Sequence, residues 1–259
     1  MRCVLSAPRL AVTTCYDPAP AHLERARLVS ARLGAPLVPR AAFEVVFSTS
    51  GATHLYVVAR AHDEVRTPEG GACFVQPSLL KMKLQDGARH PFVRALLGPD
   101  PRIEVLFDCT LGLGADAMHA ACALGCEVQG TEASPVLFSL LEEGLARLAR
   151  AAPRLARVRV CNAEAEATLA ALPDGAVDVV MLDPMMSRPK RSTPSFAVLR
   201  DFAKAERADA ALLHQAARVA RQRVVLKLGK GAPLPPDAPF AFARVERGSS
   251  VAYWVHDKA

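Results

Sequence analysis

The fold is decided by residues 103–117, which read IEVLFDCTLGLGADA. The apolar run at 103–107 predicts a buried strand, and the residues from 115 onward predict a helix. Between them lie Gly112 and Gly114, in a turn where glycine permits positive φ and a close approach to the backbone. In an open α/β sheet such a turn lies beyond the carboxyl end of the strand, where ligands bind. The first amides of the following helix then point toward the ligand.

The sequence downstream continues this alternation. Further strands are predicted at 127–132, 157–161, 177–183 and 223–228, and helices at 115–124, 134–150, 164–172 and 195–220. Ser134 is the expected N-cap of its helix. Strands that alternate with helices indicate an α/β protein with a doubly wound, mostly parallel sheet. Residues 240–247 and 250–256 predict an antiparallel C-terminal hairpin around Gly248.

The first 99 residues follow a less regular pattern, which predicts a smaller N-terminal α+β domain. Its expected elements are a helix at 21–33, β-like runs at 43–47, 54–59 and 72–75, and a short helix at 77–83. Turn-forming residues at 96–102, LLGPDPR, mark the boundary. We therefore expect one domain at 1–99 and a larger one at 100–259.

Composition excludes several classes of protein. Hydrophobic residues make up 51% of the 259 residues and charged ones 22%, which excludes a mainly disordered chain. No apolar run is long enough to span a membrane, and no secretory signal is recognisable. The seven cysteines show no CxxC spacing and the histidines no HxH or HExxH spacing, so we expect reduced thiols, no metal and a cytoplasmic protein. The net charge of +6 permits a polyanionic partner.

Two acids at strand tips suggest what the glycine-rich turn binds. Asp108 ends the first strand, and Glu132, 18 positions after Gly114, ends the second, where an acid can hold both ribose hydroxyls. This pattern fits a dinucleotide or S-adenosylmethionine, because a dinucleotide fingerprint also tolerates an Ala such as Ala117 at its third position. Asp108 would repel a pyrophosphate but suits the amino group of S-adenosylmethionine, which is therefore favoured. A tight turn without a ligand remains the plainest alternative.

Two further residues are expected near this ligand. Asn162, after the third strand, is placed to reach an adenine edge. Asp116 opens the first helix, where it either caps the helix or contacts the amino group of the cofactor.

A second site is predicted after the fourth strand. Asp183 and Pro184 can present a carboxylate and a carbonyl to the exocyclic amine of a nucleobase and aim its lone pair at a sulfonium methyl, so that catalysis is mostly positioning. We expect these two to be the catalytic residues; the alternative is that they merely end a strand. Substrate contacts are expected from the loop that follows and from the end of the next strand, at Met185, Met186, Arg188, Lys190, Arg191 and Lys227.

The segments DCTLGLGADAMHAACALGCEV, TEASPVL, LDPM and RVVLKL resemble a known family. They are similar to the bacterial small-subunit rRNA guanine-N2 methyltransferases of the RsmJ type and to their uncharacterised class I relatives, over residues 70–235. The resemblance implies a Rossmann-like domain that binds S-adenosylmethionine at Asp108, Gly112, Gly114, Asp116 and Glu132, with the target base near Asp183 and Pro184. It also implies a cofactor lid that contains Lys83, Asp86, Gly87 and Arg89.

The sequence departs from the family in two places. Met186 and Ser187 stand where the family has an aromatic residue and a proline, and residues 1–99 look closer to the uncharacterised relatives. We expect a methyltransferase that acts on a guanine N2 in small-subunit rRNA or the ribosomal subunit. The alternatives are a class I methyltransferase with a small-molecule or protein acceptor, and a cofactor-binding module without turnover. A dinucleotide oxidoreductase is less favoured because no hydride-relay pair of His and acid accompanies the turn.

Overall fold

The computed structural model describes residues 7–98, 102–184, 194–204 and 208–258. Within them a large sheet has the strand order β10-β11-β9-β8-β5-β6-β7. Its strands are β5 (Val105–Asp108), β6 (Glu127–Thr131), β7 (Val158–Cys161), β8 (Val177–Leu182), β9 (Ala220–Gly229), β10 (Arg244–Arg247) and β11 (Val251–Asp257). The strands from β7 to β9 pair in parallel, whereas β11 pairs antiparallel with β9 and β10 antiparallel with β11. The predicted Rossmann-like sheet with a C-terminal hairpin is confirmed.

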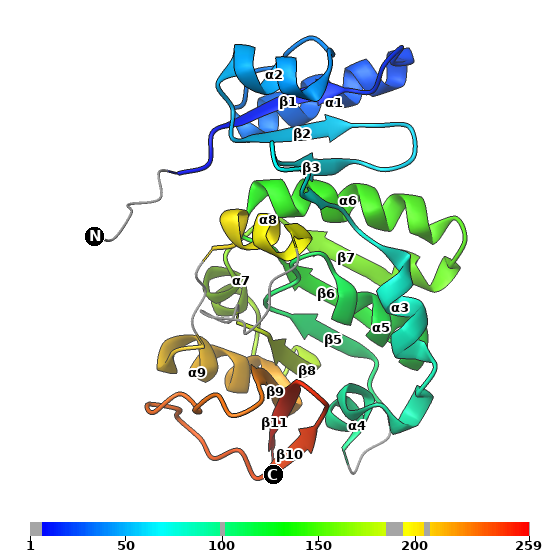
Figure 1. Cartoon of the computed structure of the whole chain (residues 1–259). Helices are drawn as coiled ribbons and strands as arrows, with labels where there is room; N and C mark the ends of the chain where they lie inside the picture. The colour runs from blue at the N-terminus through cyan, green and yellow to red at the C-terminus, as the bar shows by residue number, and fades with distance from the viewer. Residues whose placement is uncertain (1–6, 99–101, 185–193, 205–207, 259) are drawn as a thin grey trace.

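Helices cover both faces of this sheet (Figure 1). One face packs against α4 (Pro91–Leu97), α5 (Ala115–Leu124), α6 (Pro135–Ala149) and η2 (Pro153–Arg157), and the other against α7 (Ala165–Ala171) and α9 (Ala210–Val219). Ser134 caps α6 as predicted, since its hydroxyl accepts a hydrogen bond from the Leu137 amide. The strand order reverses between β5 and β8, so ligands are expected at the carboxyl ends of these two strands.

A second, smaller sheet is formed by the N-terminal region. Its order is β1 (Leu10–Thr14), β2 (His54–Val58), β3 (Glu64–Arg66) and β4 (Ala72–Cys73), with β1 and β2 parallel and the other pairs antiparallel. On one side it packs against α1 (Pro20–Leu33), α6 and α8 (Pro194–Phe202), and on the other against α2 (Phe43–Ser50). Figure 1 shows this layer stacked on the large sheet, with α6 and α8 between them.

Two predicted elements are wrong. Residues 43–47 form helix α2 instead of a strand, because Val46 and Phe47 bury one helical face on β1 and β2 and Gly51 ends the helix at φ 65°. The single helix predicted at 195–220 is two helices, α8 and α9. The Asp209 carboxylate accepts a hydrogen bond from the Leu212 amide at 3.0 Å and so starts α9 as a separate helix.

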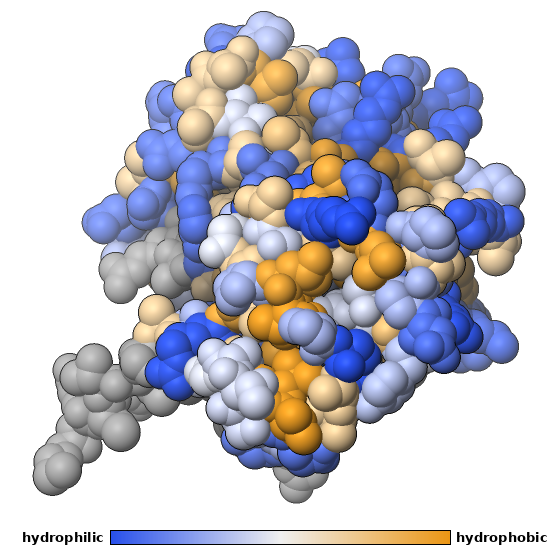
Figure 2. All heavy atoms as spheres, turned by 90° about the horizontal axis from the view of Figure 1, so that it is seen from above, coloured by the Kyte–Doolittle hydropathy of each residue, from blue (hydrophilic) through white to orange (hydrophobic). Residues whose placement is uncertain are grey.

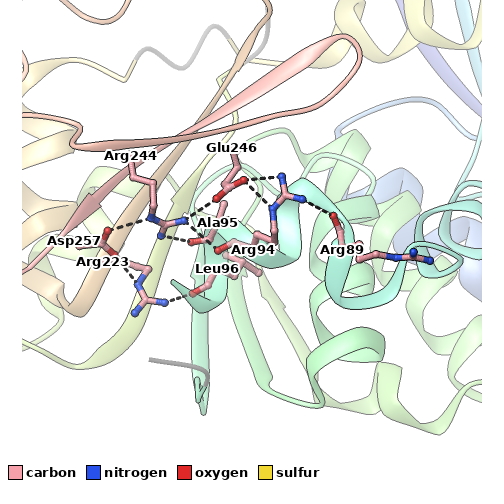
Figure 3. Close-up of polar contacts among 8 residues, drawn as sticks. All are labelled: Arg89, Arg94, Ala95, Leu96, Arg223, Arg244, Glu246 and Asp257. Atoms are coloured by element: carbon pink, nitrogen blue, oxygen red, sulfur yellow. Dashed lines mark hydrogen bonds and ion pairs between the residues drawn. The ribbon is translucent and has the colours of Figure 1, made fainter. Parts of the chain in front are cut away.

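The segment before the predicted domain boundary packs against the large sheet. It contains α3 (Pro77–Leu84), η1 (Gly87–Arg89) and α4, and Phe92 and Leu96 of α4 share an apolar core with Leu106 of β5. Figure 3 shows arginines fastening the end of α4 to β9 and β10: Arg223 donates to the Leu96 carbonyl and Arg244 to the Ala95 carbonyl. The boundary at 99/100 stays a prediction.

The outer face of the N-terminal layer carries apolar surface. Figure 2, which looks down on this layer, shows a band of hydrophobic residues between hydrophilic ones. Five of the exposed large hydrophobic side chains in the described chain belong to this layer: Tyr16, Leu23, Leu28, Leu37 and Val45. In the same described residues no helix is long and apolar enough to cross a membrane.

Candidate functional site

A cavity of 630 Å³ opens at the carboxyl ends of β5, β8 and β9, where the strand order reverses. This volume is typical of sites for small molecules and cofactors. The cavity is lined by several of the predicted residues, namely Asp108, Gly112, Asp116, Asp183, Pro184 and Lys227. The structure therefore brings together the two sites that the sequence predicts separately.

Asp108 is a buried carboxylate at the tip of β5. Its side chain accepts a hydrogen bond from the Thr110 amide at 2.9 Å, and the residue is only 2% exposed. Burial raises the pKa of Asp108 to about 7, and the nearby carboxylates of Asp116 and Asp183 act in the same direction. The Thr110 amide and Lys227 oppose this rise. Near neutral pH the charge of Asp108 is thus sensitive to the arrival of a cation.

The glycine-rich turn after β5 is held by Glu132. Gly112 and Gly114 have φ angles of 53° and 73°, which L side chains rarely adopt. Glu132 accepts hydrogen bonds from the Gly112 amide and the Ser134 amide, both at 2.8 Å, and so ties the turn to the start of α6. Burial raises the pKa of Glu132, against the effect of these two amides.

Glu132 and Asn162 do not line this cavity. The Asn162 amide donates to the Glu132 carbonyl at 2.7 Å, which joins the tips of β6 and β7. Their predicted contacts with a ribose and an adenine stay predictions, and the structure adds a local role for both in shaping the backbone.

Lys227 bridges two carboxylates across the cavity. Its Nζ atom lies 2.6 Å from Asp116 Oδ2 and 2.5 Å from Asp183 Oδ2. Burial disfavours the charge of Lys227, but Asp116 and Asp183 outweigh this effect and hold its pKa well above the usual value. Asp116 is not the N-cap of α5, because Gly114 occupies that position. A lysine expected to contact substrate is thus also an internal ion-pair partner.

Thr110 is a site residue that sequence reasoning missed. Its hydroxyl accepts a hydrogen bond from the Asp183 amide at 2.7 Å, which joins the turn after β5 to the tip of β8. Other missed lining residues come from far along the chain: Phe74 and Gln76 follow β4, and Phe196 lies on α8. No local pattern marks them, because the folded chain alone brings these segments to the cavity.

The remaining predicted residues lie away from the cavity or outside the description. The lid candidates Lys83, Asp86, Gly87 and Arg89 belong to α3 and the turn before α4, and Asp86, Gly87 and Arg89 do not line the cavity. The Arg89 carbonyl accepts a hydrogen bond from Arg94 (Figure 3). Met185, Met186, Arg188, Lys190 and Arg191 lie outside the described residues. Across the residues that are described, no three His, Cys, Asp or Glu side chains are grouped to hold a metal ion.

Comparison with known proteins shows the family of this chain. A family model described as "Putative SAM-dependent methyltransferase" matches residues 60–243. The chain belongs to this methyltransferase family. Relatives of this methyltransferase include the uncharacterized protein YpiP of Bacillus subtilis, 30% identical over 83% of this chain and 87% of that protein.

Other relatives carry a more specific name. Ribosomal RNA small subunit methyltransferase J of Nitrosococcus oceani is 33% identical over 80% of this chain and 84% of its own. The protein of that name from Pseudomonas aeruginosa is 32% identical over 88% of each chain. The crystal structure of the SAM-dependent methyltransferase NGO1261 from Neisseria gonorrhoeae covers 95% of each chain with a TM-score of 0.69 at 22% identity, which shows the shared fold.

The cavity of this methyltransferase fits its methyl donor. S-adenosylmethionine carries an ammonium and a sulfonium, and among the described residues the lining contains three carboxylates, Asp108, Asp116 and Asp183, against one cation, Lys227. Excess negative charge in a partly buried cavity favours a cationic ligand. Gly112 leaves open space at the wall of the cavity. A Cβ atom built there would have no atom within 4 Å, so a side chain at this position would occupy space that is open to the ligand. The donor supplies an electrophilic methyl group when bound.

Proposed function

We propose that this methyltransferase modifies the exocyclic N2 amine of a guanine in small-subunit rRNA, in the cytoplasm. The observation that carries the proposal is the position of Asp183, whose carboxylate lines the same cavity as Asp108 and the glycine-rich turn. The names of the relatives from Nitrosococcus oceani and Pseudomonas aeruginosa support an rRNA acceptor. The net charge of +6 suits a polyanionic substrate.

The chemistry that the proposal assigns to this chain is positioning. Asp183 accepts an N–H of the guanine amine and so directs the nitrogen toward the methyl group. A carboxylate has about four lone-pair sites, so Asp183 can bind Lys227 and the amine at the same time. A new N–C bond forms as the C–S bond breaks, and the methylated nitrogen then loses its extra proton to water. No strong base is required.

The test is transfer of a tritium label from S-adenosylmethionine. Ribosomal subunits, total RNA, protein and small molecules from a strain that lacks the gene are incubated with the purified enzyme and counted separately. The proposal predicts label in small-subunit rRNA. In Asp183→Ala we expect transfer to be lost while donor affinity, measured by calorimetry, stays within a few fold. Asp237→Ala, which changes an exposed carboxylate before β10, is the matched control.

Other results would contradict the proposal. Label only in protein or small molecules assigns a different acceptor to the same fold. Donor binding without label in any fraction indicates a cofactor-binding module. An equal loss of donor affinity in Asp183→Ala would place Asp183 in the donor site and not beside the acceptor.

A further inference from the structure

An aromatic ring from the N-terminal layer forms part of the wall of the catalytic cavity. Phe74 directly follows β4, and its neighbours Cys73 and Val75 are each 1% exposed and belong to two apolar cores. Phe74 and Gln76 line the cavity, as does Cys73. The same cavity is lined by Asp183 and Pro184, which follow β8 and lie more than 100 residues away in the sequence.

The segment that carries Phe74 is held rigidly against α6. A Cβ atom built at Gly144 would lie 2.4 Å from the Cβ of Val75, so the close packing requires glycine there. Arg147 donates to the Val75 carbonyl at 3.0 Å and pairs with Glu143 at 2.8 Å. Rigid support is what a residue needs to hold a ligand in one orientation at little entropic cost.

The Phe74 ring is also supported by a second ring. The imidazole of His62 stacks on it with centroids 3.9 Å apart and an interplanar angle of 19°. The His62 Nε2 atom lies 3.7 Å from Glu64 Oε2. Because His62 covers one face of the ring, the ring lines the cavity with its remaining surface. A fixed, half-covered aromatic ring is a suitable platform for stacking a planar ligand.

The other lining residues indicate which planar ligand this is. Glu132 and Asn162, the predicted contacts of the adenosine, lie at the tips of β6 and β7 and do not line the cavity. The lining includes Asp183, Pro184 and Lys227, together with the glycine-rich turn after β5 and the start of α5. Phe74 thus lines the part of the site where the acceptor residues meet the turn that holds the donor.

We propose that Phe74, backed by His62, is the platform on which the target base stacks while Asp183 binds its amine. This inference rests on the proposed function and names a specificity residue for it. An acceptor base must leave its own stack to enter such a cavity, and a ring of the enzyme replaces part of the stacking that is lost. Stacking depends on the aromatic ring and not on its bulk, so the effect of a substitution separates this role from simple packing.

The experiment compares Phe74→Leu with Phe74→Tyr. We measure KM and kcat for small-subunit rRNA and the Kd of S-adenosylmethionine by calorimetry. Phe74→Leu is expected to raise the RNA KM by about 5- to 150-fold, the range that loss of one base–aromatic stack produces. The donor Kd is expected to stay within twofold, and Phe74→Tyr to restore the RNA KM. Phe240→Leu is the matched control, because Phe240 stacks on His256 at 4.1 Å away from the cavity.

Three results would overturn the inference. A rise of the donor Kd in Phe74→Leu would show that the ring binds the cofactor. An unchanged RNA KM in Phe74→Leu, with the loss in Phe196→Leu instead, would move the platform to α8. If Phe74→Tyr is properly folded but its RNA KM is as high as that of Phe74→Leu, Phe74 has a packing role only. If the wild-type enzyme does not methylate rRNA at all, the proposed function itself fails, and that outcome is distinct from these three.

Discussion

The raised pKa of Asp108 predicts how the stability of this methyltransferase depends on pH. Asp108→Asn removes the titrating group, and its amide oxygen can still accept the hydrogen bond from the Thr110 amide. In the folded protein the pKa of Asp108 is about 7, whereas the ordinary pKa of an Asp carboxyl is 3.8. The folded state therefore binds this proton more tightly than the unfolded state. Its contribution to stability is present below pH 4 and is lost as pH rises toward 7.

The magnitude follows from the same two values. A difference of about three pH units, at about 1.36 kcal/mol each, is on the order of 4 kcal/mol. No correction for solvent screening is needed, because Asp108 is only 2% exposed. The free energy of unfolding of Asp108→Asn relative to wild type is expected to increase from about pH 4 to about pH 8 by roughly this amount and to stay level above that.

The assay is urea denaturation at half-unit steps from pH 4.5 to pH 8.5, followed by the fluorescence of Trp254, the single tryptophan of the chain. Asp178→Asn serves as the opposite control. Burial disfavours the Asp178 carboxylate, but hydrogen bonds from two backbone amides and the Arg221 side chain outweigh this and lower its pKa. That variant is expected to lose stability at neutral pH and to approach wild type as pH falls.

Parallel stability curves for wild type and Asp108→Asn would refute the reasoning, because they would show that Asp108 keeps the same charge in both states. The argument has a second consequence for binding. A cationic donor favours the ionised carboxylate, so the Kd of S-adenosylmethionine is expected to fall from pH 6 to pH 8 in wild type and to lose this slope in Asp108→Asn.

Two further substitutions test the packing and charge of the site. Lys227→Met leaves Asp116 and Asp183 without their shared cation. We expect a loss of about 3 kcal/mol in the free energy of unfolding, measured by urea denaturation. A loss below about 0.5 kcal/mol would show that the two ion pairs contribute little to stability. Gly114→Ala combines a positive φ with a Cβ that would lie 2.5 Å from a neighbouring methyl group. It is expected to cost more than Gly175→Ala, where φ is also positive but no atom lies within 4 Å, and equal melting temperatures would contradict the clash.

The elements around β5 were predictable because their signals are local. Apolar periodicity marks the strands and helices, Gly125 ends α5, and Ser134 caps α6. Each of these signals acts through contacts within a few residues. Residues 43–47 predict a strand because Val and Phe favour strands by propensity. In the structure they form a helix, because this places Val46 and Phe47 against β1 and β2. The pattern over 195–220 predicts one helix, but the Asp209 side chain caps a new helix, α9, and so separates it from α8.

The sequence by itself determined the parallel sheet, the glycine-rich turn with Asp108, and the Asp183-Pro184 pair at the tip of β8. These follow from periodicity, glycine positions and strand ends, which act over short stretches of chain. The tertiary structure alone decided that Lys227 pairs with both Asp116 and Asp183, and that Phe74 lines the same cavity. The physical reason is that a buried charge is stable only beside a partner of opposite charge. The partners of Lys227, and the segment that carries Phe74, are brought together only in the complete fold.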